Sequence, residues 1–256
     1  MTKPVESHTA PQFFVDPSMV LGNQVVLTGD PLRHAKAGRL SPGEAFRAVQ
    51  GDTIYEARVE EVLPDRLIAT ITSRKRAHPP AARVHLYAAL LKGQSFDLVV
   101  EKATELGVTS IAPVVTRRTV PRLDPDKAAE RKARWQKVSR AASEQSGRGV
   151  VPEIREVVSF CELMRQAATG TPVAVPGRRL LAYEHEGLTV DLAQALAGAT
   201  EASVLIGPEG GLDASEVEEA LNRGFIPISL GPYILKAETA SLAAVALLTH
   251  LLSKQA

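Results

Sequence analysis

The chain has 256 residues, of which 30 are basic and 29 are acidic. Its formal net charge of +1 excludes a simple polycation, although a local basic patch could still bind nucleic acid. The length allows one large domain or two smaller ones, and the single cysteine, Cys161, excludes a disulfide framework and a cysteine-based metal cluster. Since no apolar run approaches the roughly 20 residues of a membrane span and the start lacks a signal segment, we expect a cytoplasmic protein.

Residues 1–76 carry the signals of short β-strands. Four segments are rich in β-branched residues: 24–28, 44–49, 53–62 and 66–73. Gly51 and Asp52, between the second and third of these, suit a hairpin turn. The pattern predicts a small barrel of antiparallel strands. Residues 77–82, where a Pro-Pro pair follows a basic run, are predicted to form a linker.

Residues 83–256 alternate between apolar strands and helices. A strand over 84–91 precedes a helix over 95–107, which Ser95 is placed to cap and Gly107 to end. Further elements follow in order: a strand at 110–115, a helix around Trp135, a strand near Ile154, a helix from Ser159, a strand at 179–183, a helix from Val190, and strands at 203–206 and 226–230. This alternation predicts a parallel sheet that is covered on both faces.

The stretch "LIGPEGGLDASEVEEAL", residues 205–221, joins a strand to a helix through a glycine-rich loop. Asp213 and Glu216 are spaced as a capping box for that helix. The loop has neither a following Lys nor the G-x-G-x-x-G spacing, so a phosphate site is not indicated. Together with the later loop "GPYILKAE", it predicts a pocket of backbone groups that suits a neutral adenine ring. Taken alone, the three glycines would fit a tight turn equally well.

Three further features bear on assembly and metal binding. The helix over 240–252 is apolar on nearly every side, so we expect it to pack in a subunit interface as well as on the sheet. Cys161 lies on an amphipathic helix and is expected to be buried. The six histidines show no metal-ligand spacing, so no metal is expected, and His85 and His185 are interpreted as structural.

Five motifs, "LLKG", "EKATELGV", "EQSGR", "LIGPEGG" and "LGPYILKAETA", occur in an order and spacing that resembles the bacterial 16S ribosomal RNA uridine-N3 methyltransferases of the knotted SPOUT superfamily. "RHAKAGRLSPGE" resembles the N-terminal RNA-binding segment of that family, so the resemblance covers nearly the whole chain. It implies an α/β fold, with an N-terminal PUA-like β-barrel and a C-terminal domain that contains a deep trefoil knot.

The resemblance also implies a function. The family uses S-adenosylmethionine, works as a homodimer through the knot region, and makes 3-methyluridine at the position conventionally numbered 1498 in 16S rRNA of the small ribosomal subunit. Two alternatives stay open: a related knotted methyltransferase that acts on another RNA, and a non-catalytic RNA-binding assembly protein.

The matching motifs assign site residues. The implied cofactor-binding residues are Ile206, Gly207, Glu209, Gly210, Gly211, Leu230, Gly231, Ile234, Leu235, Thr239 and Ala240. The implied RNA-binding residues are Arg33, His34, Lys36, Arg39, Lys92, Arg140 and Tyr233. The basic helix around Trp135 could also be merely a solvated face.

The candidate catalytic residues are Arg148, Lys236 and Glu238. Uridine N3 becomes a good nucleophile only when its proton leaves, so the enzyme must accept that proton or stabilise the uridinate anion. Arg148 best suits anion stabilisation because Arg is always charged, whereas Glu238 could be the base or hold the base's partner. Tyr233 and Lys236 stand where the family usually has Arg, which makes substrate contact at this loop less secure than cofactor binding.

Overall fold

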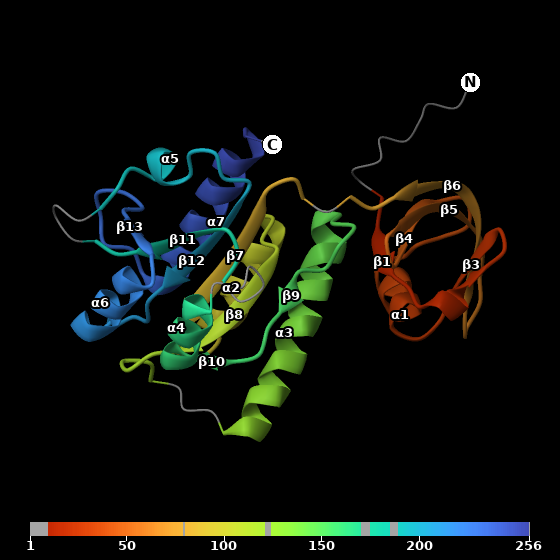
Figure 1. Cartoon of the computed structure of the whole chain (residues 1–256). Helices are drawn as coiled ribbons and strands as arrows, with labels where there is room; N and C mark the ends of the chain where they lie inside the picture. The colour runs from red at the N-terminus through yellow and green to blue at the C-terminus, as the bar shows by residue number, and fades with distance from the viewer. Residues whose placement is uncertain (1–9, 79, 121–123, 170–174, 185–188, 256) are drawn as a thin grey trace. The chain divides into compact units, whose positions relative to one another are not determined.

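The computed structural model describes residues 10–255, except 79, 121–123, 170–174 and 185–188. The chain divides into two compact units (Figure 1). The first unit comprises Met1–Pro79 and Arg140–Val151, and the second comprises Pro80–Ser139 and Pro152–Ala256. Residues 140–151 thus pack with the N-terminal strands, and the sequence-based boundaries at 76 and 83 stay a prediction.

The first unit contains a curled six-stranded sheet. Its strands lie in the order β1 (Gln12–Phe14), β4 (Ala45–Gln50), β5 (Thr53–Val62), β6 (Leu67–Arg76), β3 (Gln24–Leu27) and β2 (Val20–Leu21). Register shifts in β5 after Glu56 and Val59 mark bulges, which increase twist and help the sheet to curl around its apolar core. The four strands expected from the sequence are confirmed.

Two features of the first unit differ from the expectation. The sheet is a mixed half-barrel rather than an antiparallel barrel, because β1 pairs parallel with β4. A parallel pair needs a long connection, and the intervening residues, which include β2, β3 and α1 (Gly29–Ala37), supply it. Helix α1 was not predicted; its Leu32 and Ala35 are buried against the sheet. A short 3-10 turn, η1 (Pro17–Met19), precedes β2.

The second unit contains a parallel sheet. Its main path runs β10 (Val158–Ser159), β8 (Ser110–Val115), β7 (Arg83–Ala89), β12 (Glu201–Ile206), β11 (Arg178–Ala182) and β13 (Ile226–Ile228), and β9 (Glu153–Ile154) pairs with β8. Every pair among the described strands of this sheet is parallel.

Helices cover both faces of this sheet. They are α2 (Ser95–Glu105), α3 (Pro125–Ser146, with its last turns in the first unit), α4 (Phe160–Ala168), α5 (Leu192–Ala195), α6 (Ala214–Asn222) and α7 (Ala237–Ser253). Leu86 packs in the cluster formed with α2, α3, α5 and α7, whereas its neighbour Tyr87 packs with α4 and α6. The predicted parallel sheet with two covered faces is therefore confirmed, and with it the α/β class.

Local predictions in the second unit had mixed outcomes. The capping box of Asp213 and Glu216 is confirmed. Gly107 follows α2 with a left-handed φ of 100°, as a helix-ending glycine should. Ser95 is not the cap, because Gln94 holds that position without a side-chain bond. Cys161 is exposed, not buried, since the buried side of α4 consists of Phe160, Leu163, Met164 and Ala167.

The two histidines interpreted as structural have different outcomes. His85 is buried, with Nδ1 2.8 Å from Ser110 Oγ and Nε2 3.1 Å from Glu201 Oε1, in agreement with a structural role. His185 lies outside the described residues.

The strand order decides where a ligand can sit. Strand β11 lies between β12 and β13, so the carboxyl ends of three neighbouring strands meet at one edge of the sheet. Helix α7 starts at that edge and packs against β7, β12 and α2. The trefoil knot itself stays an expectation from the resemblance. Among the described residues, no helix has the length and apolar character needed to cross a membrane.

Candidate functional site

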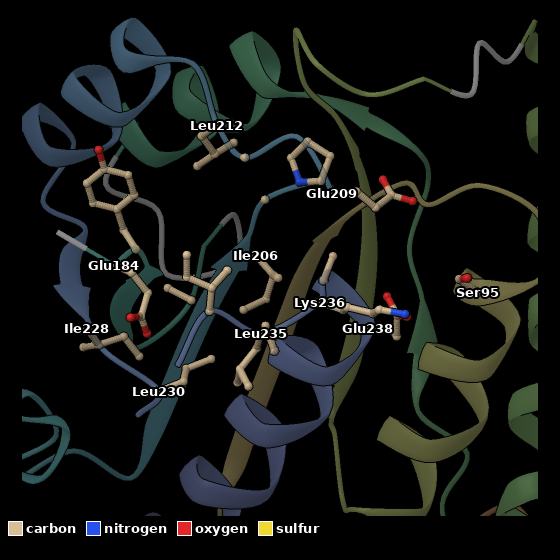
Figure 2. A pocket seen from close by; sticks show the side chains of 18 residues that line it. Ser95, Glu184, Ile206, Glu209, Leu212, Ile228, Leu230, Leu235, Lys236 and Glu238 are labelled. Carbon is tan, nitrogen blue, oxygen red and sulfur yellow. The ribbon is translucent and has the colours of Figure 1, made fainter. Parts of the chain in front are cut away.

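A cavity of about 590 Å³ lies at the carboxyl ends of β11, β12 and β13 (Figure 2). Its described lining residues are Ser95, Ala182, Tyr183, Glu184, Ile206, Gly207, Pro208, Glu209, Gly211, Leu212, Ile228, Leu230, Ile234, Leu235, Lys236, Ala237, Glu238 and Ala240. Crevices at this end of parallel strands are the usual ligand sites of open α/β sheets. The position therefore makes the cavity the leading candidate for a functional site.

The cavity gathers most of the residues that the sequence assigns to the cofactor. Eight of the eleven line it: Ile206, Gly207, Glu209, Gly211, Leu230, Ile234, Leu235 and Ala240. Gly210, Gly231 and Thr239 are outside the described lining. A Cβ on Gly210 would lie nearest to the Arg118 side chain, at 3.7 Å, so this position faces a neighbouring loop.

Sequence reasoning missed the part of the lining that β11 supplies. Ala182, Tyr183 and Glu184 stand at the end of this strand, and Ser95 stands at the start of α2. The strand itself was predicted at 179–183. The position of β11 between β12 and β13 was not predicted, and this position brings Glu184 to the cavity. Pro208, Leu212, Ile228 and Ala237 are neighbours of predicted residues and were also missed.

The cavity has an apolar middle and polar ends. In Figure 2, Ile206 and Leu235 occupy the centre of the view, with Glu184 to one side and Glu209, Lys236 and Glu238 to the other. The hydroxyl of Ser229 lies 3.2 Å from Glu184 Oε1, which ties the ends of β11 and β13 together. Such a lining suits a flat apolar ring that carries polar groups at its periphery.

Two of the three candidate catalytic residues stand at this cavity. Lys236 is the N-cap residue of α7, and Glu238 lies in the first turn of that helix. Lys236 provides no side-chain hydrogen bond to the helix start. Residues of the first turn of α7 line the cavity, so the unpaired N–H groups of that turn and the positive end of the helix dipole lie beside it.

Arg148, the third candidate, belongs to the first unit. Its N–H donates to Ser143 O (2.9 Å), and its carbonyl accepts from Gln12 Nε2 (2.6 Å), so the half-barrel holds its backbone. Burial lowers the pKa of the Arg148 guanidinium to about 10. The group is still cationic at neutral pH, as an anion-stabilising role requires.

The residues assigned to RNA binding are spread over the molecule. Arg33, His34 and Lys36 lie on the exposed side of α1, and Arg39 follows that helix with a left-handed φ of 57°. Arg33 pairs with Asp30, and Lys36 donates to Pro64 O (2.7 Å). The side chains of Arg33, Lys36 and Arg39 are exposed and can contact phosphates, and RNA binding stays a prediction.

The other three members of that set have distinct surroundings. The Arg140 guanidinium donates to Phe14 O (2.7 Å) and lies over the Phe14 ring, so this side chain already makes structural contacts within the first unit. Lys92 donates its backbone N–H to Glu209 Oε1 (3.3 Å). Tyr233 is 77% exposed beside Ile234, which lines the cavity and is 92% exposed. Tyr233 is thus available to stack on a base.

Comparison with known proteins adds independent evidence. A family model described as an RNA methyltransferase domain matches residues 78–249. Ribosomal RNA small subunit methyltransferase E from Bacillus subtilis is 29% identical over 236 residues, covering 88% of this chain and 89% of that protein. The protein of the same name from Mycobacterium tuberculosis is 32% identical over 243 residues, covering 92% of this chain and 88% of its own length.

A solved structure is similar over nearly the full length. Ribosomal RNA small subunit methyltransferase E from Neisseria gonorrhoeae, bound to S-adenosyl methionine, has a TM-score of 0.80 and 28% identity, covering 94% of this chain and 98% of that chain. The similarity spans both the half-barrel and the parallel-sheet domain, and it confirms the family that the sequence motifs indicated. The chain belongs to the ribosomal RNA small subunit methyltransferase E family, with a SPOUT-like RNA methyltransferase domain.

Proposed function

We propose that this protein transfers the methyl group of S-adenosylmethionine to N3 of a uridine in 16S rRNA of the small ribosomal subunit, at the position conventionally numbered 1498. The observation that carries the proposal is the cavity at the ends of β11, β12 and β13, which gathers eight of the eleven predicted cofactor residues. The Neisseria relative binds S-adenosyl methionine and shares this fold. An enzyme with this substrate acts in the cytoplasm.

The lining fits the chemistry of the cofactor. Ile206, Leu230 and Leu235 offer apolar surface to an adenine ring. The carboxylate of Glu184, at one end, can accept hydrogen bonds from ribose hydroxyls. At the other end, Glu209 and the start of α7 can receive the charged methionine portion. When bound, the cofactor supplies a methyl group already activated by the sulfonium.

The protein's own task is to prepare the uridine. The N3–H bond must break and its proton must pass to a base, while N3 forms a bond to the methyl carbon and the S–CH₃ bond breaks to release S-adenosylhomocysteine. Glu238 is the candidate acceptor of the proton. Lys236, which lines the cavity, is the candidate to stabilise the uridinate oxygens, and Arg148, on the first unit, stays a separate candidate for an anion-stabilising role.

Two measurements test the proposal against its alternatives. Deleting the gene in the source organism should remove 3-methyluridine from 16S rRNA, as measured by mass spectrometry of nucleosides. Loss of a methylated base from another RNA would instead favour a related target, for which the exposed Tyr233 in place of the family's Arg leaves room. Titration calorimetry with S-adenosylmethionine should release heat, whereas a pure assembly protein should show none.

We also propose that the protein forms a homodimer. Helices α2 and α7 pack against each other, and large apolar side chains are exposed at both: Leu98 on α2, Leu106 at the C-cap of α2, and Leu247 on α7. A contiguous exposed apolar patch is typical of a subunit interface, and we infer that these side chains contribute to one. Sedimentation at micromolar concentration should show a dimer that Leu247→Glu weakens. A wild-type monomer that methylates RNA at full rate would contradict this assembly.

A further inference from the structure

We propose that Arg118 is a positioning residue, which holds the glycine-rich loop of residues 207–212 in the shape that binds the cofactor. The inference rests on the proposed function, since it takes that loop as a wall of the cofactor cavity. Arg118 lies in the turn that follows β8 and is outside the described lining of the cavity.

The Arg118 guanidinium contacts the loop at two places. Nη1 donates to the carbonyl of Gly210 (3.0 Å), in the middle of the loop. Nη2 lies 3.4 Å from Asp213 Oδ2, on the residue that ends the loop and caps α6. The planar fork of Arg presents its donors to two such groups in a fixed geometry, which the flexible Lys ammonium does not provide. One side chain thus fixes the loop relative to the helix that follows it.

The turn that carries Arg118 is anchored without that side chain. The N–H of Thr116 donates to Thr119 Oγ1 (2.9 Å), and the N–H of Arg117 donates to Glu216 Oε1 (2.9 Å). Glu216 is only 3% exposed, and its Oε2 accepts from the N–H of Asp213 (3.0 Å). Removing the Arg118 side chain should therefore free the loop and leave the turn and α6 in place.

The loop has one internal backbone hydrogen bond among the described residues, so contacts from outside it contribute much to its order. Gly211 adopts a left-handed φ of 70°, and its N–H donates to Pro208 O (2.9 Å). Glycines lose more backbone freedom on ordering than any other residue. Glu209 and Gly211, on either side of the carbonyl that Arg118 holds, both line the cavity. A loop ordered in advance binds its ligand more tightly, because less entropy is lost on binding.

Arg117 distinguishes this role from a simple charge effect. Its side chain is 67% exposed, against 51% for Arg118, and it reaches Asp213 Oδ1 at 3.4 Å but makes no hydrogen bond to a loop carbonyl among the described residues. Both residues carry the same charge on the same turn. Arg117→Ala is therefore a matched control for Arg118→Ala.

The experiment compares Arg118→Ala, Arg118→Lys and Arg117→Ala with the wild type, by calorimetry with S-adenosylmethionine and by RNA binding at two salt concentrations. We expect Arg118→Ala to raise the Kd for the cofactor about fivefold to tenfold, the value of one ordinary hydrogen bond, because solvent screens the half-exposed guanidinium. Arg118→Lys should fall between Arg118→Ala and the wild type, and Arg117→Ala should match the wild type. In kinetics, Arg118→Ala should raise the KM for the cofactor and keep kcat.

Two results would overturn the inference alone: cofactor affinity that is unchanged in a folded Arg118→Ala, or a loss of RNA affinity with a shallower salt dependence, which would make Arg118 a phosphate contact. A wild-type chain that binds no S-adenosylmethionine would instead overturn the proposed function, and this inference with it. Thermal melting of each variant establishes that it is folded.

Discussion

Gly207, at the end of β12, offers a steric test of the cofactor cavity. A Cβ at this position would lie 3.2 Å from Leu212 Cγ and 3.3 Å from Leu212 N. Both residues line the cavity, so the added methyl group must displace its wall. At Gly210 the nearest described atoms would be Arg118 Cβ and Cδ, at 3.7 and 3.8 Å, which are ordinary contacts. Neither glycine has a left-handed φ, so any difference between the two alanine variants reflects the room for a side chain and not backbone strain.

The expected size follows from the contacts. Leu212 is buried in the cluster formed with α4 and α6, so it has little room to move. Overpacking at such a site costs about 1–3 kcal/mol, and 1 kcal/mol corresponds to about a fivefold change in an equilibrium constant. We therefore expect Gly207→Ala to raise the Kd for S-adenosylmethionine at least about fivefold, and Gly210→Ala to change it less than about twofold.

Titration calorimetry on both variants measures this difference, with circular dichroism as the check of folding. If Gly207→Ala binds the cofactor as tightly as Gly210→Ala does, the loop of residues 207–212 is not a wall of the cofactor site. If Gly210→Ala is the weaker binder, the ligand approaches the loop from the side that Arg118 occupies. Either result would refute the assignment of the cavity.

Three further predictions concern chemistry, RNA binding and pH. Glu238→Gln and Arg148→Ala should each lower kcat by about 10²-fold or more at unchanged RNA affinity, the usual cost of losing a base or an anion-stabilising donor; steady-state kinetics showing normal turnover would remove that residue from the chemistry. Arg39→Gly should raise the melting temperature, because a left-handed backbone at a non-glycine residue costs roughly 1–2 kcal/mol. The same variant should raise the KM for RNA and flatten the salt dependence of RNA binding. An unchanged KM would exclude a phosphate contact by Arg39. Burial lowers the pKa of His85 below 6.5 despite its bond to Glu201, so the unfolded chain takes up the proton before the folded one does. The free energy of unfolding should therefore fall as the pH drops below about 6.5. Chemical denaturation should show a flatter pH dependence for His85→Gln, and an identical slope would contradict this.

The sequence predicted most of the secondary structure because the signals are local. Apolar runs bounded by turn residues gave the main strands of both units. The spacing of Asp213 and Glu216 gave the start of α6. Cys161 was mispredicted although the information was present: Phe160, Leu163, Met164 and Ala167 form the apolar stripe, and position 161 lies about 100° away from Phe160 on the helix.

The parts that could not be predicted depend on contacts between distant segments. The insertion of β11 between β12 and β13 decides that Glu184 borders the cavity, and no local pattern encodes strand order. The parallel pairing of β1 with β4 is non-local in the same way. Helix α1 was missed because its short apolar side, Leu32 and Ala35, lies among cations that were interpreted only as an RNA-binding segment.

The proposed methylation of uridine N3 in 16S rRNA can be tested directly on the RNA. The most direct measurement is to incubate unmethylated small ribosomal subunits, or naked 16S rRNA, with the purified protein and S-adenosylmethionine carrying a labelled methyl group. The RNA is then digested and the labelled nucleoside is identified by mass spectrometry. We expect the label in 3-methyluridine at a single position, which Glu238→Gln should nearly abolish. Label in another nucleoside, or none in either substrate, would contradict the account.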